Sequence, residues 1–287
     1  MISPAPQFLD LTLGDGCNLH AAQGGSGPDV VLVHGSLALL EDMLLGPYEA
    51  LAAGFRVTAF DRPGHGRSGR RRLDASIWRQ ADALNEAAER LAVKRPVVVG
   101  HSFGGSVALA WALRHPASIA GLVLVAPLAF PEPRLEQLLF GPRAVPVLGD
   151  VMARTGGPVL DALAAPLLSR AMFAPQEIPA RMRAEFPLEL VLKPRNMQSN
   201  GEDALEAIFG LAVAATLYPS CTTPVRILAG GSDRVVNPTL HGQALAGLLP
   251  HGAFVRMEGL GHMLHHFAQA AIVEAVEAVR QSGRPSD

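Results

Sequence analysis

The feature that most constrains the fold is a regular alternation of continuous apolar segments with helix-compatible ones. The apolar segments lie at residues 30–33, 56–60, 96–99 and 119–125, and the helix-like stretches between them lie near 41–53, 75–92 and 104–115. Strands that are apolar along their whole length are typical of parallel sheets buried on both faces. The alternation therefore predicts an α/β fold, with a mostly parallel sheet flanked by helices on both faces.

A hairpin precedes this alternation and a second strand–helix series follows it. Two short alternating runs, 8–13 and 18–22, flank the turn Gly14-Asp15-Gly16 and predict an antiparallel hairpin. Near the other end of the chain we expect a strand, a helix, a second strand and a closing helix, at residues 225–229, 240–249, 253–257 and 263–280.

Between these series the strand signal disappears. From Pro127 to about Pro219, prolines, leucines, methionines and phenylalanines recur in short helix-compatible stretches such as 157–173 and 204–217. We interpret this segment as a helical cap inserted into the sheet domain. The predicted division is a core of residues 1–126 and 220–287 and a cap of residues 127–219.

Composition excludes several classes of protein. Hydrophobic residues make up 49% of the 287 residues, and the formal net charge of −2 provides no attraction for nucleic acid. The only cysteines, Cys17 and Cys221, form neither a disulfide framework nor a metal-ligand spacing, which fits a cytoplasmic protein. We expect no signal peptide, membrane span, metal or cofactor, and the sequence leaves the oligomeric state open.

The main chemical signal follows the strand at 96–99 and precedes a helix-forming run. It is the segment Gly100-His101-Ser102-Phe103-Gly104-Gly105. A sharp strand-to-helix turn holds such a serine in a strained conformation, and the glycines on either side permit close approach of neighbouring backbone. Ser102 is therefore the candidate nucleophile, although a serine there could also be a simple helix N-cap.

A serine hydroxyl needs a base and a group that orients the base. Asp233 follows the strand at 225–229, and His262 follows the next strand, so both are expected at the carboxyl edge of the sheet. Asp233 could alternatively close a local turn. His265 is the alternative to His262, and His266 lies nearby as well.

Two backbone amides are candidates for an oxyanion hole. One belongs to Phe103, directly after the nucleophile, and the other to Ser36, in the His34-Gly35-Ser36 segment that follows the strand at 30–33. Leu37 could replace Ser36, and His34-Gly35 could instead serve only to turn the chain.

A further loop, Asp61-Arg62-Pro63-Gly64-His65-Gly66-Arg67-Ser68-Gly69, is dense in turn-forming residues. Asp61, His65 and Ser68 could be proposed as catalytic, but glycines and proline favour a rigid structural loop beside the site. The adjacent run Arg70-Arg71-Arg72 is predicted to be a solvated surface patch.

These motifs together resemble the α/β-hydrolase superfamily, in particular its capped branch of small esterases, lactonases, haloperoxidase-like perhydrolases and carbon–carbon bond hydrolases. The resemblance rests on His34-Gly35, the loop from Asp61 to Ser68, the segment around Ser102, Asp233, and Gly261-His262. It covers the sheet and leaves the cap unmatched. Because the nucleophile position holds serine, it implies acyl transfer to water more than the aspartate-based chemistry of dehalogenases and epoxide hydrolases.

We therefore predict a serine hydrolase that cleaves an ester or lactone of a small apolar substrate through an acyl-enzyme on Ser102. A carbon–carbon hydrolase, a cofactor-free perhydrolase and a non-catalytic binding protein on the same fold stay as alternatives. Substrate contacts are expected from His34, Leu37, Leu168, Met172 and Phe173. Further cap residues could line an acyl pocket or form the cap's own core, namely Leu160, Leu163, Leu167, Phe209 and Leu217.

Overall fold

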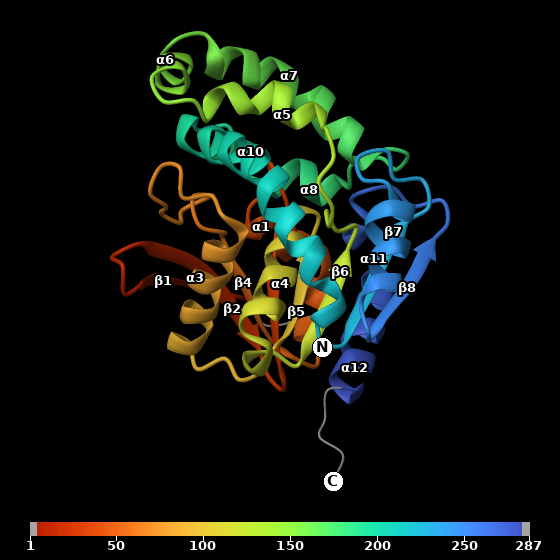
Figure 1. Cartoon of the computed structure of the whole chain (residues 1–287). Helices are drawn as coiled ribbons and strands as arrows, with labels where there is room; N and C mark the ends of the chain where they lie inside the picture. Colours follow the sequence, from red (N-terminus) through yellow and green to blue (C-terminus); the bar gives the residue numbers. More distant parts are fainter. Residues whose placement is uncertain (1–4, 283–287) are drawn as a thin grey trace.

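An eight-stranded sheet forms the centre of the structure, a computed structural model that describes residues 5–282 (Figure 1). The strand order is β1-β2-β4-β3-β5-β6-β7-β8. The strands are β1 (Gln7–Thr12), β2 (Asn18–Gly25), β3 (Asp29–Val33), β4 (Arg56–Phe60), β5 (Val97–His101), β6 (Gly121–Val125), β7 (Val225–Gly230) and β8 (Gly252–Met257). β2 pairs antiparallel with β1 and β4, and all other pairs are parallel. The predicted fold class is confirmed.

Helices cover both faces of this sheet. The α-helices of the described chain, of which α5 to α10 belong to the insertion between β6 and β7, are α1 (Leu40–Met43), α2 (Glu49–Ala52), α3 (Ile77–Arg90), α4 (Phe103–Arg114), α5 (Leu135–Phe140), α6 (Leu148–Arg154), α7 (Gly157–Phe173), α8 (Ala180–Glu185), α9 (Leu188–Val191), α10 (Pro194–Leu217), α11 (Leu245–Leu248) and α12 (Gln269–Ser282). On β3, Val31 and Val33 join the apolar cluster formed with α3, α4 and α10, whereas Val30 and Leu32 join the cluster formed with α1, α2 and α12. This division explains why the strands are apolar throughout.

The predicted helix at 41–53 is broken. Short helix α1 passes into the π-helical segment η1 (Leu44–Tyr48), where Gly46 has non-helical dihedral angles and Pro47 lacks an N–H group, and α2 follows. The closing helix also starts later than expected. The 3₁₀ turn η6 (Leu264–His266) precedes α12, so His262 lies in a loop.

A helical insertion connects β6 to β7, as expected. Figure 1 shows α5, α6 and α7 stacked beyond the sheet, while α10 descends from them along the side of α4. Helix α10 has 24 residues and begins at Pro194, ten positions before the start of the predicted helix at 204–217. The first part was missed because its buried side chains are polar, among them Asn196, Asn200 and Asp203, so it carries no apolar periodicity.

The exact limits of core and cap stay predictions. Within residues 5–282, no helix combines the length and the apolar character that crossing a lipid bilayer requires.

Candidate active site

The turn between β5 and α4 holds Ser102 in a strained backbone conformation. Its φ of 52° and ψ of −122° lie in a region that residues with a side chain rarely adopt. A Cβ at Gly104 would come within 2.3 Å of the Val33 carbonyl oxygen, and one at Gly100 within 2.6 Å of the Gly104 carbonyl oxygen. Glycine is therefore required on both sides of the serine. The Ser102 side chain makes no hydrogen bond that caps α4, so it does not act as a simple helix N-cap.

The Ser102 hydroxyl instead points toward His262. Its Oγ lies 3.0 Å from His262 Nε2, and His262 Nδ1 lies 2.8 Å from Asp233 Oδ2. The side chains of His262 and Asp233 are only 2% and 1% exposed, and Ser102 is 9% exposed. The structure therefore brings together the three residues expected at the carboxyl edge of the sheet, in the geometry of a nucleophile, a base and an orienting acid.

Asp233 performs two structural tasks at once. Its Oδ1 accepts hydrogen bonds from the N–H groups of Val235 and Val236, so the turn role considered from the sequence is present as well. Burial alone would raise its pKa, but the charge and hydrogen bond of His262 and the two amides hold the pKa of Asp233 below its usual value. An ionised Asp233 accepts a hydrogen bond from the Nδ1–H group, which leaves the Nε2 lone pair of His262 facing Ser102.

His265, the alternative base, has a different partner. His265 Nε2 and His266 Nε2 donate to the two carboxylate oxygens of the buried Asp42, at 3.0 and 2.9 Å. Ligand-type atoms of Asp42, His101 and His265 lie within 4.8 Å of one another, a spacing from which a metal site could be suspected. Because both Asp42 oxygens already accept hydrogen bonds, we interpret this cluster as an anchor beneath the His262 loop.

The backbone amides around the serine differ in what they bind. Leu37, in a left-handed conformation with φ of 53°, donates its N–H to Asn200 Oδ1 at 2.8 Å. Within residues 5–282, the N–H groups of Ser36 and Phe103 donate to no other group. Gly35 lies against the nucleophile, since a Cβ there would come within 2.9 Å of the Ser102 Cβ. This arrangement favours Ser36 over Leu37 as the second oxyanion donor.

The loop that follows β4 is mostly buried and held by hydrogen bonds. Asp61 accepts hydrogen bonds from the N–H groups of Leu40 and Arg67, and Ser68 Oγ donates to the Asp61 carbonyl oxygen. His34 is fully buried too, and its Nε2 accepts the N–H of Arg62 at 3.0 Å. His34 thus holds two loops together and does not line the cavity described below.

The sequence predicts that the run Arg70-Arg71-Arg72 is a solvated surface patch, but one of these arginines is buried. The side chain of Arg70 is 4% exposed and bonds to Asp203 and Glu202 on α10, at 2.6 and 3.0 Å. The prediction was wrong for Arg70 because the acidic partners come from a helix more than 100 positions away, which the sequence could not place.

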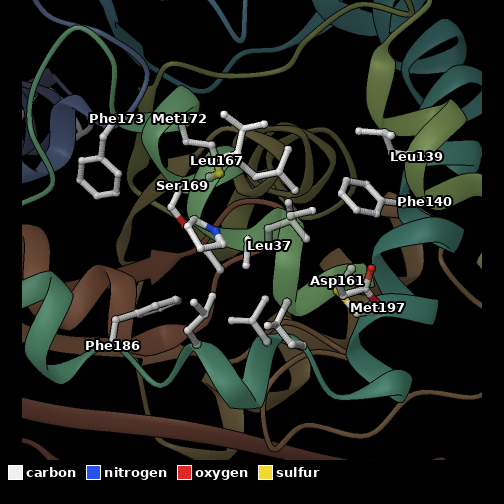
Figure 2. A pocket seen from close by; sticks show the side chains of 18 of the residues that line it. Leu37, Leu139, Phe140, Asp161, Leu167, Ser169, Met172, Phe173, Phe186 and Met197 are labelled. Carbon is white, nitrogen blue, oxygen red and sulfur yellow. The ribbon is translucent and has the colours of Figure 1, made fainter. Parts of the chain in front are cut away.

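A large apolar cavity lies between the sheet edge and the cap. Its volume is about 690 Å³, and Leu37 and Met263, the neighbours of Ser36 and His262, line it beside the candidate site. Figure 2 shows the side chains of Leu37, Met172 and Phe186 around the cavity. Ser102 is not among the described residues that line it.

The cap residues expected at a pocket divide into two groups. Five line the cavity, namely Leu160, Leu167, Leu168, Met172 and Phe173. The other three, Leu163, Phe209 and Leu217, are not among the described residues that line it. Both faces of α7 are apolar, which is why sequence alone could not distinguish its cavity side from its exposed side.

Several cap residues support the site and carry no local sequence signal. Gln176 donates to the Gly259 carbonyl oxygen and accepts the Gly261 N–H, at 2.7 and 2.9 Å, so it holds the loop before His262. Asn200 holds Leu37, and Asp203 binds Arg62. These contacts depend on how the cap lies on the core.

The comparisons with known proteins agree with this architecture. A family model described as alpha/beta hydrolase fold matches residues 28–269. An uncharacterised protein of Mycobacterium tuberculosis is 27% identical over 99% of this chain and 84% of its own length. Among solved structures, a protein of Pseudomonas aeruginosa provisionally assigned as an epoxide hydrolase has a TM-score of 0.78, with 22% identity over 99% of both chains. An esterase of Thermogutta terrifontis has a TM-score of 0.71, with 22% identity over 97% of this chain and 100% of that one.

Proposed function

Because the chain belongs to the α/β-hydrolase family, we propose that it is a serine esterase acting on substrates with an apolar acyl group. The observation that carries this proposal is the continuous hydrogen-bonded series from Ser102 Oγ through His262 to Asp233, at 3.0 and 2.8 Å. An aspartate nucleophile would be needed for dehalogenase or epoxide-hydrolase chemistry, and position 102 holds serine.

In the first half of the reaction, Ser102 Oγ attacks the ester carbonyl carbon and its proton passes to His262 Nε2. Asp233 stabilises the resulting imidazolium through Nδ1. The negative charge that develops on the carbonyl oxygen is held by the N–H groups of Ser36 and Phe103, which have no competing acceptor within the described chain. Collapse of this intermediate breaks the ester bond, and the alcohol leaves with the proton from His262.

In the second half, His262 removes a proton from water, and the hydroxide oxygen attacks the acyl carbon on Ser102. The same two amides hold the oxyanion, and Ser102 Oγ leaves with the proton returned by His262. The products are a carboxylic acid and the free enzyme, so no cofactor enters the balance.

The cavity supports the apolar acyl preference. Its wall is mainly leucine, methionine, phenylalanine and alanine, and its 690 Å³ lies within the range of pockets that bind whole small molecules. The buried ion pair of Arg143 and Asp161 is a polar feature of its wall, and burial raises the pKa of Asp161. An acyl chain entering past Leu37 would replace water against apolar surface.

The test is hydrolysis of p-nitrophenyl esters of increasing acyl length by wild type and by Ser102→Ala. We expect turnover that depends on Ser102 and rises from acetate to medium-length chains before the cavity is filled. A fluorophosphonate that labels activated serines provides a second readout that does not depend on choosing the right ester.

Three outcomes can be distinguished. Turnover that persists in Ser102→Ala would contradict the mechanism. Labelling of Ser102 without turnover of any ester would mean that the nucleophile is active but the scissile bond belongs to another class. A wild type that neither turns over esters nor reacts with the phosphonate would favour a binding protein on this fold.

A further inference from the structure

The guanidinium of Arg62 lies fully buried behind both segments that form the proposed oxyanion hole. Its Nε donates to the His34 carbonyl oxygen at 3.0 Å, and its Nη2 donates to the Gly35 carbonyl oxygen at 3.1 Å. On its other side, the guanidinium carbon lies 4.7 Å from the centre of the Phe103 ring. One side chain therefore contacts the backbone before Ser36 and the residue after the nucleophile.

The contact with Gly35 bears directly on the donor group of Ser36. The peptide that joins these residues is trans and planar, so its C=O and N–H point in opposite directions. A partner that fixes the C=O therefore also fixes the direction of the Ser36 N–H. The Gly35 oxygen accepts from Arg62 Nη2 and also from His34 Nδ1, at 3.1 and 2.8 Å. A cation on the carbonyl also polarises the peptide and makes its N–H a stronger donor.

From this geometry we propose that Arg62 is a positioning residue for the oxyanion hole and that the cap holds it in place. The inference rests on the proposed esterase function, because it assigns a role within that same site. Arg62 contacts no substrate; it acts through the Gly35–Ser36 peptide and the Phe103 ring.

The link to the cap is a buried ion pair. Asp203 of α10 accepts from Arg62 Nη1 at 2.7 Å, and Gln80 Oε1 accepts from the same nitrogen at 2.8 Å. Burial lowers the pKa of Arg62, whereas the carboxylate of Asp203 opposes that change. Asp203 is itself held by Arg70 Nη1 at 2.6 Å. The carboxylate of Asp203 and the guanidinium of Arg62 therefore connect α10 to the Gly35–Ser36 peptide.

A purely structural ion pair would have the same distances, so the test needs a matched control. Arg70 supplies it, because it binds the same carboxylate and is also buried but makes no bond to residues 34–37. Lysine at position 62 keeps the charge but loses the planar fork that reaches two carbonyls and the carboxylate together. Arg62→Lys and Arg70→Lys should thus both lower the melting temperature, but only the first should disturb the oxyanion hole.

Kinetics separate these two roles. Loss of one oxyanion donor typically lowers kcat by about 100-fold to 1000-fold, so a misdirected donor is expected to lower it by roughly 10-fold to 100-fold. For Arg62→Lys we expect this fall in kcat, and in the rate of fluorophosphonate labelling, with KM unchanged. Arg70→Lys should keep a kcat close to that of the wild type. Labelling carried to completion counts the folded enzyme in each preparation.

A second matched pair covers the case in which Arg62→Lys does not fold. Asp203→Asn removes the charge that holds Arg62, whereas Glu202→Gln removes the neighbouring buried carboxylate, which binds Arg70 and Arg72 but not Arg62. We expect kcat to fall in Asp203→Asn and not in Glu202→Gln, again at constant KM.

The outcomes are decisive in each direction. Equal kcat values within each folded pair, with the wild type active, would overturn the positioning role and leave the esterase function standing. A fall in kcat confined to Arg62→Lys and Asp203→Asn would support it. A wild type that shows neither turnover nor labelling would overturn the proposed function and this inference with it.

Discussion

Replacing Ser102 by glycine and by alanine separates backbone strain from catalysis, because both variants lose the nucleophile. The φ of 52° and ψ of −122° at this position cost an alanine about 1–3 kcal/mol, whereas glycine adopts them without a steric penalty. Glycine also makes the unfolded chain more flexible, which costs roughly 0.4–1 kcal/mol. The free energy of unfolding of Ser102→Gly should therefore exceed that of Ser102→Ala by about 1 kcal/mol.

The measurement is urea unfolding followed by fluorescence and circular dichroism. Ser106 provides the control, because it lies in the regular part of α4 and both of its variants lose the same hydrogen bond to the Leu128 carbonyl oxygen. At Ser106 glycine should be less stable than alanine by about 1 kcal/mol, the reverse order. If alanine were the more stable replacement at both positions, the strain assigned to Ser102 would be refuted.

Three further predictions concern single residues. Asp233→Asn should lower kcat by about 1000-fold to 10,000-fold without changing the circular dichroism spectrum, because the amide favours the wrong tautomer of His262; a mild loss in steady-state assays would contradict this. Gly104→Ala should lower the free energy of unfolding by at least about 1–3 kcal/mol in urea, since its Cβ would meet the Val33 carbonyl oxygen; a wild-type unfolding midpoint would refute it. Burial raises the pKa of Asp61 to about 6, against the backbone hydrogen bonds that it accepts, so the folded protein keeps a proton that the unfolded chain releases near pH 4. Wild-type stability should consequently fall by about 2 kcal/mol from this group as pH rises from 4 to 7, and Asp61→Asn should lack that fall; equal pH slopes in urea unfolding would show that Asp61 does not titrate there.

The parts predicted from sequence are those specified by local signals. Ser102 lies in a turn where neighbouring backbone atoms come too close to leave room for a Cβ at Gly100 or Gly104. The motif is therefore recognisable in six consecutive residues. Asp233 and His262 were found because each follows a buried strand, and the edge of a parallel sheet brings such loops together. The structure places the three side chains within hydrogen-bonding distance.

The parts that sequence reasoning missed depend on how distant segments pack. Arg62 and Asp203 are 141 positions apart, and neither has a neighbour that indicates the other. The first turns of α10 were missed for the same reason, since their polar face is buried against the loop that carries Arg62 and Arg70. A polar helix face is predicted to be exposed to solvent unless its partner is known. Here the partner is the pair of core arginines, Arg62 and Arg70.

The direct pairing of β6 with β7 also bears on how the substrate range of such a chain can change. The strands lie side by side although the whole segment from Ala126 to Pro224 separates them, so folding must close that loop whatever it contains. The entropic cost of loop closure rises by only about 0.6 kcal/mol for each doubling of loop length. Insertions and deletions among α5 to α9 should therefore change the free energy of sheet formation only slightly. Such remodelling must still keep α10, which carries Asp203, and Gln176, which holds the loop before His262, in place.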